Sequence, residues 1–266
     1  MCESEETIYD YHSRLNLEGK RTVLVDNRRK LDYVLRKVRK YLKPSSAACD
    51  IGIGEGYVLT RLYDKGLKVT GIEISKYCVE YLENDYKKKG LEIKLINGDI
   101  TNIELDENQF DVVTCFDVLE HIPKNKQSST FETLKRCIVN GGLLIATVPL
   151  GENLDQNMVM CPKCRHKFHR VGHHCSFESA EAINELLQPD FTIIKMGEVP
   201  RNWFKSNTVN SPVTLLINLV KWILQRKRVL RPSILWHERV SIRSNCQIRA
   251  GLADRINVFP THSAQR

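Results

Sequence analysis

Between residues 45 and 200, short apolar runs alternate with longer segments whose apolar residues recur at helical spacing. The apolar runs, bounded by glycine, asparagine or proline, are typical of buried strands, and the segments between them are typical of amphipathic helices. This alternation predicts a doubly wound α/β fold, with a mostly parallel sheet and helices on both faces. The predicted strands are residues 47–51, 67–72, 91–96, 110–116, 143–148 and 191–199, and the predicted helices are residues 57–65, 75–89, 125–139 and 177–187.

Ahead of this domain, residues 15–42 carry apolar side chains at helical spacing, with basic residues between them. The apolar face consists of Leu31, Val34, Leu35 and Val38. Pro44 ends the pattern. We therefore expect residues 1–44 to form an N-terminal helical cover over one side of the sheet, and residues 45–200 to form the main domain.

The C-terminal segment, residues 201–266, is patterned differently. Between Val213 and Gln225 one narrow polar stripe runs along an otherwise apolar stretch, which predicts an amphipathic helix. Four Lys and Arg residues follow it. Such a helix is suited to a membrane interface with anionic headgroups, and equally to packing against the core or a dimer partner. Residues 236–248 alternate enough to supply a last edge strand.

Length and composition place the chain among ordinary globular proteins. Its 266 residues suffice for one large α/β domain with an insert or a tail. No stretch reaches the roughly 18 apolar residues of a membrane-spanning helix, and the first ten residues lack the apolar core of a secretory signal. We therefore expect a cytoplasmic protein, peripheral to a membrane at most, whose nine cysteines are reduced thiols.

The positive charge is concentrated in the C-terminal segment. The whole chain carries a formal charge of +8, whereas residues 201–266 hold twelve Lys and Arg against two acids, a net of +10. Residues 1–200 therefore carry the difference, −2. A basic segment of this kind binds anionic lipid or nucleic acid, or forms a solvated face.

The stretch Asp50-x-Gly52-x-Gly54-x-Gly56 joins a predicted strand to a predicted helix. Glycine adopts positive φ and lacks a Cβ, so a ligand can lie directly against such a turn. In an open α/β sheet this turn lies at the carboxyl edge of the strands, where ligands bind. Glu73 ends the next strand, where an acid accepts hydrogen bonds from ribose hydroxyls. The sequence therefore predicts a nucleoside-binding site.

These residues belong to a longer set of motifs. The set also includes Gly71-Ile72-Glu73-Ile74-Ser75, Gly98-Asp99-Ile100, Phe110-Asp111-Val112-Val113, and Gly141-Gly142 before Ala146-Thr147-Val148-Pro149. Together the motifs resemble a class I S-adenosylmethionine-dependent methyltransferase over roughly residues 45–150. The resemblance implies a seven-stranded Rossmann-like sheet and S-adenosylmethionine as the methyl donor. A dinucleotide-binding dehydrogenase would instead favour Gly-x-Gly-x-x-Gly, because its turn holds a pyrophosphate.

The resemblance also implies roles for single residues. Asp50, Gly52 and Gly54 would line the methionine and sulfonium portion of the cofactor. Gly56 would allow tight helix packing, and Glu73 would take the ribose hydroxyls. The other cofactor positions are Asp99 at the adenine amino group, Ile74 and Ile100 on the faces of the adenine ring, and Phe116 and Asp117 beside the donor methyl.

The run Asp117-Val118-Leu119-Glu120-His121-Ile122 gives a more specific match. It resembles the segment after strand four of ubiquinone-biosynthesis O-methyltransferases, where an acid three residues before a Glu-His pair is associated with metal binding near the acceptor. Asp117, Glu120 and His121 would then bind a metal. Alternatively, Asp117 and His121 are catalytic, with His121 as a general base on an acceptor hydroxyl. A third alternative is that Glu120 and His121 only brace the strand–helix junction.

An insert after the fifth strand, residues 155–176, holds three of the nine cysteines and four of the eight histidines. Cys161-Pro-x-Cys164 is a common zinc-knuckle turn, and His169 and His173 complete a tetrahedral Cys2His2 set. The substitutes are His166, His174 and Cys175. We expect a structural zinc in a lid or rim on the acceptor side. The alternative is a loop of unliganded side chains.

These features predict an S-adenosylmethionine-dependent methyltransferase that acts on the hydroxyl of a small molecule, a glycan or a lipid-linked metabolite. Two other classes stay open. An RNA methyltransferase would use the basic C-terminal segment to hold phosphates. A non-catalytic partner subunit would bind the cofactor without an acceptor pocket around Asp117 and His121. The sequence does not specify which acceptor atom receives the methyl group.

Overall fold

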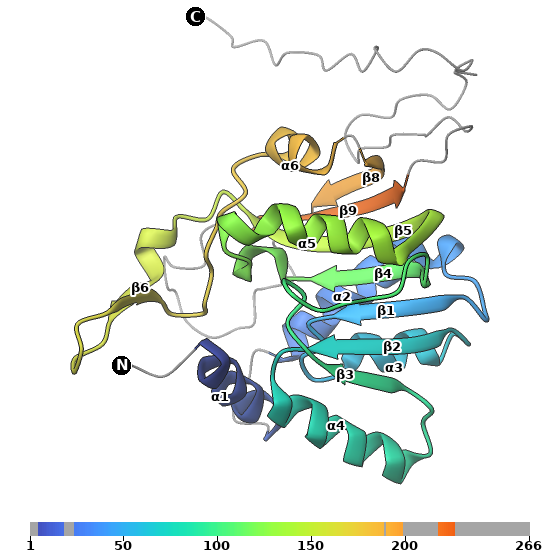
Figure 1. Cartoon of the computed structure of the whole chain (residues 1–266), viewed down its shortest axis with the longest axis horizontal. Helices are drawn as coiled ribbons and strands as arrows, with labels where there is room; N and C mark the ends of the chain where they lie inside the picture. The colour runs from blue at the N-terminus through green and yellow to red at the C-terminus, as the bar shows by residue number, and fades with distance from the viewer. Residues whose placement is uncertain (1–4, 19–23, 189, 199–217, 227–266) are drawn as a thin grey trace, which may run out of the picture.

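The computed structural model describes residues 5–18, 24–188, 190–198 and 218–226 (Figure 1). One sheet has the strand order β3-β2-β1-β4-β5-β9-β8. Strands β1 to β5 are parallel, and β9 is antiparallel to both β5 and β8. The prediction of a mostly parallel Rossmann-like α/β sheet is therefore confirmed. The strand bounds are β1 Ala47–Ile51, β2 Lys68–Glu73, β3 Lys94–Asn97, β4 Phe110–Phe116, β5 Ile138–Leu150, β8 Phe191–Glu198 and β9 Asn218–Arg226.

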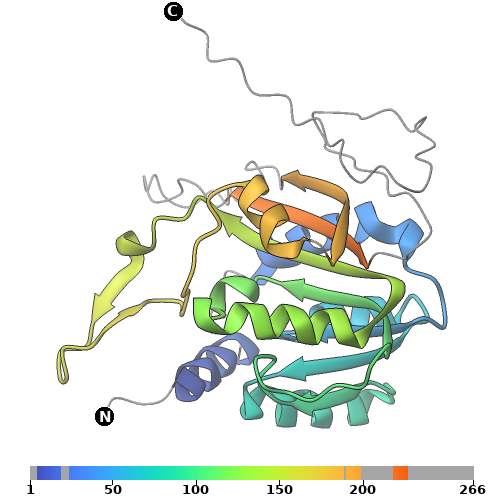
Figure 2. The ribbon, with the colours of Figure 1, turned by 45° about the horizontal axis from the view of Figure 1, so that its top comes forward.

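Helices cover both faces of the sheet, as Figures 1 and 2 show, with α5 on the near side and α2 and α3 behind. One apolar cluster packs α2, α3 and α4 against the sheet, and a second cluster packs α5 and α6 against the opposite face. The helix bounds are α1 Glu5–Leu17, α2 Leu24–Val38, α3 Tyr57–Tyr63, α4 Lys76–Lys89, α5 Lys124–Cys137 and α6 Ala180–Leu187, with 3-10 turns η1 Arg39–Tyr41, η2 Leu119–His121 and η3 Leu154–Asn157.

The helix α4 begins at a capping residue that also anchors α1. The Ser75 hydroxyl accepts a hydrogen bond of 3.1 Å from the backbone N–H of Cys78, which satisfies one of the free donors of the first turn. The same hydroxyl donates to the Asp10 carboxylate over 2.5 Å. Helix α1 is thereby held against the beginning of α4, at the end of the sheet to which β1, β2 and β4 point (Figure 1).

The amphipathic helix predicted between Val213 and Gln225 is wrong where the structure describes this stretch. Residues 218–226 form strand β9, which pairs along its length with β5 and β8. The edges of β5 and β8 would otherwise present unpaired N–H and C=O groups, and a strand between them satisfies both edges. Long-range pairing therefore overrode a local helical pattern. The proposed edge strand at residues 236–248, and most of the basic segment, lie outside the described residues.

The Gly141-Gly142 pair follows the helix predicted over residues 125–139 and lies within β5. Helix α5 ends at Cys137, and β5 begins at Ile138. The glycines instead lie inside β5, where the pairing with β4 shifts between Phe110 and Val112 and Gly141 has φ +79°. Glycine accommodates such an irregularity because it tolerates positive φ. Within the described ranges, no helix is long and apolar enough to cross a bilayer.

Candidate active site

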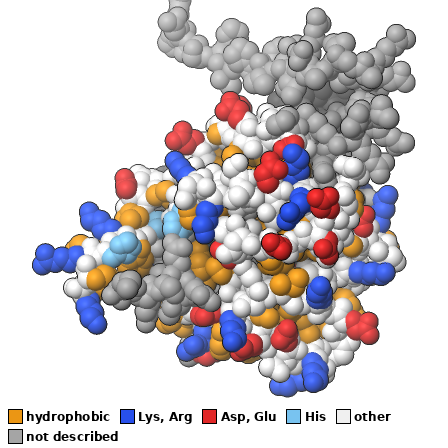
Figure 3. Space-filling view, in the orientation of Figure 1, with side chains coloured by type: hydrophobic (Ala, Val, Ile, Leu, Met, Phe, Trp, Pro, Cys, Tyr) orange, Lys and Arg blue, Asp and Glu red, His pale blue; other side chains and the backbone are white. Residues whose placement is uncertain are grey.

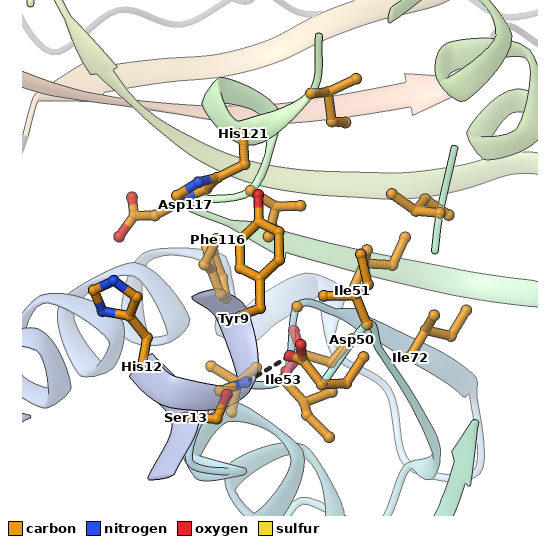
Figure 4. A pocket seen from close by; sticks show the side chains of 18 of the residues that line it. Tyr9, His12, Ser13, Asp50, Ile51, Ile53, Ile72, Phe116, Asp117 and His121 are labelled. Atoms are coloured by element: carbon orange, nitrogen blue, oxygen red, sulfur yellow. Dashed lines mark hydrogen bonds between the residues drawn. The ribbon is translucent and has the colours of Figure 1, made fainter. Parts of the chain in front are cut away.

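A cavity of about 440 Å³ lies at the carboxyl ends of β1, β2 and β4. This volume is in the range of ligand pockets, roughly 300–1,000 Å³. Residues after each of these strands line it, together with side chains of α1 and α2. Figure 4 shows Asp117 directly after β4 and His121 in the following turn, with Tyr9 of α1 beside His121. The cavity therefore lies where open α/β sheets bind ligands.

The glycine turn after β1 forms one wall of this cavity. Gly52, Gly54 and Gly56 have φ of +71°, +52° and +74°. A Cβ on Gly54 would meet nothing within 4 Å, so the backbone is bare on the cavity side. A Cβ on Gly56 would lie 2.1 Å from the Tyr86 hydroxyl, so this glycine allows α4 to pack against the turn. Gly52 and Gly54 line the cavity, and Gly56 lies behind them.

Two buried acids, Asp50 and Glu73, border the glycine turn. Asp50 accepts a hydrogen bond of 2.5 Å from the Thr114 hydroxyl, and burial raises its pKa to about 8. Glu73 accepts from the backbone N–H groups of Ser75 at 3.0 Å and Gly54 at 3.3 Å. Burial raises the pKa of Glu73, and these N–H groups oppose that rise. Both acids line the cavity.

The loop after β3 contributes the third acid. Asp99 accepts hydrogen bonds from the backbone N–H and the hydroxyl of Thr101, each at 2.8 Å. Its carboxylate is thus held by a local turn and still lines the cavity. The apolar residues Ile74, Ile100 and Phe116 also line the cavity. The structure therefore brings together every expected cofactor residue, with Gly56 alone outside the lining.

Asp117, directly after β4, is held by two partners. Its φ is +55°, uncommon for a residue other than glycine. One carboxylate oxygen accepts a hydrogen bond of 2.7 Å from the Thr147 hydroxyl, and the other forms an ion pair with Lys30 of α2. Lys30 is 3% exposed. Asp117 is therefore held by Lys30 and Thr147, and among the described residues its carboxylate does not group with Glu120 and His121 as the predicted metal set required.

Glu120 and His121 lie in the short turn η2, and the insert packs on them. The backbone N–H groups of His174 and Cys175 both donate to the Glu120 carbonyl. The Glu120 side chain is 1% exposed, and burial, with Asp117 nearby, raises its carboxyl pKa. Burial lowers the pKa of His121 to about 4, so this imidazole is neutral at pH 7. Glu120 and His121 thus brace the turn after β4 against the insert, a role that the sequence left open.

The insert forms a two-stranded hairpin, β6 (Met158–Met160) and β7 (Lys167–His169). Lys and Arg side chains gather around its projecting tip (Figure 3). Cys161 and Cys164 lie in the tip, whereas His169 pairs with Met158 at the base. Cys161 follows Met158 by three positions, a separation of about 10 Å along an extended chain. The hairpin thus keeps the two predicted cysteine ligands away from His169.

The two histidines predicted as zinc ligands have an acidic neighbour instead. Glu152 lies 2.5 Å from Nδ1 of His173 and 3.7 Å from Nε2 of His169. Among the described residues, ligand atoms within 4.8 Å of one another come from two sets, Glu120–His121–His173 and Glu152–His169–His173. Neither set includes a cysteine. The predicted Cys2His2 set is therefore not assembled in this structure.

The site residues that the sequence did not predict include Lys30, Tyr9 and Glu152. Lys30 precedes Val34 by four positions, so the helical period itself places it on the buried face of α2. Tyr9 lies 6.0 Å, centroid to centroid, from the His121 ring, and comes from a helix whose start was not predicted. Glu152 follows β5 without any flanking motif. Of these residues, only Lys30 could have been predicted, from its helical spacing to Val34.

Comparison with known proteins agrees with this geometry. Residues 49–146 match the family described as Methyltransferase domain (Methyltransf_11). The ubiquinone biosynthesis O-methyltransferase of Rickettsia bellii (strain OSU 85-389) is 27% identical over 140 residues, which cover 52% of this chain and 58% of that protein. The same-named protein of Coxiella burnetii (strain Dugway 5J108-111) is 32% identical over 74 residues, 28% of this chain and 32% of that protein. The matches thus span at most 58% of the length of these curated relatives.

Solved structures share the fold at low identity. The 1,6-didemethyltoxoflavin-N1-methyltransferase of Burkholderia thailandensis, with bound S-adenosylhomocysteine, has a TM-score of 0.59 and 15% identity over 86% of this chain and 92% of its own. The N-methyltransferase NodS of Bradyrhizobium japonicum WM9 has a TM-score of 0.53 and 16% identity, over 76% and 88%. The motifs, the sheet and the match of residues 49–146 to the methyltransferase domain family together support a domain of the class I S-adenosylmethionine-dependent methyltransferase type.

Proposed function

We propose that this protein transfers the methyl group of S-adenosylmethionine to a hydroxyl group of a small molecule, a glycan or a lipid-linked metabolite. The observation that carries the proposal is the single cavity between the glycine turn and the end of β4. Gly54 and Glu73 lie in its donor half, and Asp117 and His121 lie in its acceptor half. The O-methyltransferase relatives favour an oxygen acceptor.

The donor half fits the cofactor. S-adenosylmethionine supplies, when bound, a methyl group on a sulfonium that a nucleophile attacks. Bare backbone at Gly54 admits the methionine portion, and Asp50 lies beside it. The Glu73 carboxylate, aligned by two backbone N–H groups, would accept the ribose hydroxyls. Asp99 would accept from the adenine amino group, between Ile74 and Ile100.

The acceptor half orients a hydroxyl rather than supplying covalent chemistry. Positioning and exclusion of water provide much of the rate in methyl transfer. Asp117, fixed by Lys30 and Thr147, would accept a hydrogen bond from the acceptor. His121 would present its second ring nitrogen, because Nδ1 is occupied by the Gly172 carbonyl. We assign these two residues to the acceptor.

The other elements of the proposal rest on the sequence. A structural zinc on Cys161 and Cys164 stays a prediction. His169 and His173 lie apart from the hairpin tip, so they do not complete its ligand set in this structure. A cytoplasmic location, with peripheral membrane contact for a lipid-linked acceptor, stays a prediction as well. The basic segment that would hold RNA lies mainly outside the described residues.

Two measurements test the function. Calorimetry with S-adenosylhomocysteine should show binding to the purified protein. Transfer of a labelled methyl from S-adenosylmethionine should then be assayed against RNA, lipid, glycan and small-molecule fractions of a cell extract. Label in one of the last three supports the proposal, and label in RNA supports the alternative enzyme. Binding without transfer to any fraction indicates a non-catalytic subunit, and a failure to bind overturns the donor site.

A further inference from the structure

The insert supplies a histidine to the acceptor half of the cavity. His173 lies in the loop after β7, and it lines the cavity together with Val171 of the same loop. Its ring centroid lies 4.8 Å from that of His121 in η2, with the two rings nearly perpendicular. The insert is therefore folded back so that one of its histidines adjoins the turn after β4, inside the same cavity.

Contacts on two sides hold the ring of His173. Its Nδ1 atom lies 2.5 Å from a carboxylate oxygen of Glu152, which follows β5 and has a side chain only 13% exposed. The backbone N–H of His173 donates a hydrogen bond of 3.0 Å to Nδ1 of His169 in β7, and the two imidazole rings stack with centroids 4.8 Å apart. Residues from both ends of the insert thus fix the orientation of this ring.

The Glu152 contact also determines which ring nitrogen of His173 carries the proton. An ionised carboxylate accepts hydrogen bonds and cannot donate them, so Nδ1–H is the donor. In the neutral ring the lone pair is then on Nε2. This is the arrangement of a general base, because a carboxylate behind the ring holds the tautomer and stabilises the imidazolium that forms when Nε2 takes a proton.

The matching contact of His121 is to a neutral group. Its Nδ1 atom lies 3.0 Å from the Gly172 carbonyl oxygen, which fixes a tautomer but carries no charge to balance an imidazolium. Asp117 also acts on the His121 ring, but the charge of this carboxylate is balanced by Lys30. Of the two histidines that meet in the acceptor half, His173 is therefore the better proton acceptor, and His121 is suited to holding the acceptor by a hydrogen bond.

We propose that His173 is the general base of methyl transfer and that Glu152 is the residue that positions it. The inference rests on the proposed function, because it requires a hydroxyl acceptor. The acceptor O–H gives its proton to Nε2 of His173, and an oxygen electron pair forms the bond to the methyl carbon. The carbon–sulfur bond breaks with its electron pair staying on sulfur. The products are S-adenosylhomocysteine, a methyl ether and an imidazolium, whose proton then passes to water.

This role differs from the one that the sequence predicted for His173. A zinc knuckle required His173 beside Cys161 and Cys164, whereas the structure places Glu152 at its Nδ1 atom and the cysteines at the hairpin tip. Under the proposal, the insert contributes a reacting group to the active site in addition to bordering it.

The first experiment measures methyl transfer by the full-length protein at saturating S-adenosylmethionine. The acceptor probe is the small-molecule, glycan or lipid fraction of a cell extract that takes up most label with the wild-type protein. His173→Ala should lower the rate by about 100–10,000-fold, the usual contribution of a general base. Imidazole in the buffer should restore part of this rate, because it can replace the deleted ring. His174→Ala, an exposed neighbour outside the cavity lining, is the matched control and should transfer at the wild-type rate.

Glu152→Gln separates orientation from charge. The amide oxygen can still accept a hydrogen bond from Nδ1–H of His173, whereas the charge that stabilises the imidazolium is lost. The transfer rate should fall by about 5–30-fold. The affinity for S-adenosylhomocysteine, measured by calorimetry, should be unchanged, because Glu152 does not line the cavity.

Nuclear magnetic resonance of the ring nitrogens gives a readout that needs no acceptor. Long-range proton–nitrogen spectra of protein labelled at its histidines distinguish the two tautomers, and the His173→Ala variant assigns the signals. His173 should be the Nδ1–H tautomer in the wild-type protein, and Glu152→Ala should convert it to a mixture. An Nε2–H tautomer in the wild-type protein would overturn the proposal, because the lone pair would then face Glu152.

The rate measurements distinguish failure of this inference from failure of the proposed function. A wild-type rate in His173→Ala would overturn the inference and leave the proposed function standing. Absence of label in all three fractions with the wild-type protein would overturn the proposed function, and the inference with it. S-adenosylhomocysteine binding, measured on every variant, reports folding and the donor site separately.

Discussion

The backbone N–H of Gly54 donates a hydrogen bond of 3.3 Å to the Glu73 carboxylate. This contact joins the turn after β1 to the end of β2, and the N–H of Ser75 holds the other carboxylate oxygen at 3.0 Å. The acid expected to bind the ribose is therefore already aligned with the turn expected to receive the methionine portion. Alignment of this kind reduces the ordering cost of binding.

Glu73→Gln tests this alignment. The amide keeps the size of the side chain and removes the charge, and hydrogen bonds to charged groups exceed neutral ones by about 1 kcal/mol or more. We expect S-adenosylhomocysteine affinity to fall by roughly 5–30-fold per lost set of contacts, measured by calorimetry. Glu80→Gln, on the exposed side of α4, is the control. Equal affinities for the two variants would remove Glu73 from the site.

Gly54→Arg should abolish cofactor binding. Gly54 faces open cavity space, so the arginine side chain would enter it without a clash in the backbone. The control is Gly90→Arg at the end of α4, because Gly90 also has positive φ and also has nothing within 4 Å of a Cβ. Both variants bear the same kind of left-handed backbone cost, about 1–2 kcal/mol. Binding that survives in Gly54→Arg would mean that the turn has been misassigned.

Cofactor binding should release a proton from Asp50. Burial raises the pKa of this carboxyl to about 8 in the free protein, so it is largely protonated at pH 6–7. A sulfonium placed beside it favours the charged form and lowers that pKa. Calorimetry of S-adenosylmethionine in buffers of different ionisation enthalpy should show release approaching about one proton. Asp50→Asn should lose this buffer dependence, and an unchanged release would locate the proton elsewhere.

The ion pair between Lys30 and Asp117 should contribute to stability as well as to the site. Among the described residues, Lys30→Met leaves Asp117 with Thr147 as its side-chain partner. Breaking a buried pair costs about 3–5 kcal/mol, and exposure of one third of Asp117 reduces this to about 1–3 kcal/mol. Urea unfolding should measure the loss. Lys37→Met, on the exposed face of the same helix, should change stability by less than about 0.5 kcal/mol.

Gly56 and Tyr86 should be energetically coupled. A Cβ at position 56 would overlap the Tyr86 hydroxyl, which donates a hydrogen bond of 3.2 Å to the Gly56 carbonyl. Gly56→Ala should therefore cost about 2–4 kcal/mol from overlap and positive φ. In a Tyr86→Phe background the overlap is relieved, and the cost should fall by about 1 kcal/mol or more. Strict additivity in a double-mutant cycle would show that the two residues do not touch.

Local patterns were sufficient for the parts of the fold that depend on nearest neighbours in sequence. The helix predicted from residue 75 onward corresponds to α4, and β1 to β5 followed from apolar runs bounded by turn residues. The residues that the resemblance implied for the cofactor line one cavity, because parallel strands place their carboxyl ends at one edge of the sheet. The helix prediction for residues 218–226 was wrong because the secondary structure of this stretch depends on the open edges of β5 and β8, with which it pairs.

By itself, the sequence determined the α/β sheet and the position of the glycine turn and the post-strand acids at one edge of it, since strand period, glycine spacing and post-strand acids are local properties. Only the tertiary structure decided the surroundings of Asp117 and His121. It paired Asp117 with Lys30 of α2, and it folded the insert so that His173 adjoins His121 while Cys161 and Cys164 stay at the hairpin tip. These contacts join segments far apart in the chain, and residue spacing alone does not determine which distant side chains meet when helices and inserts pack.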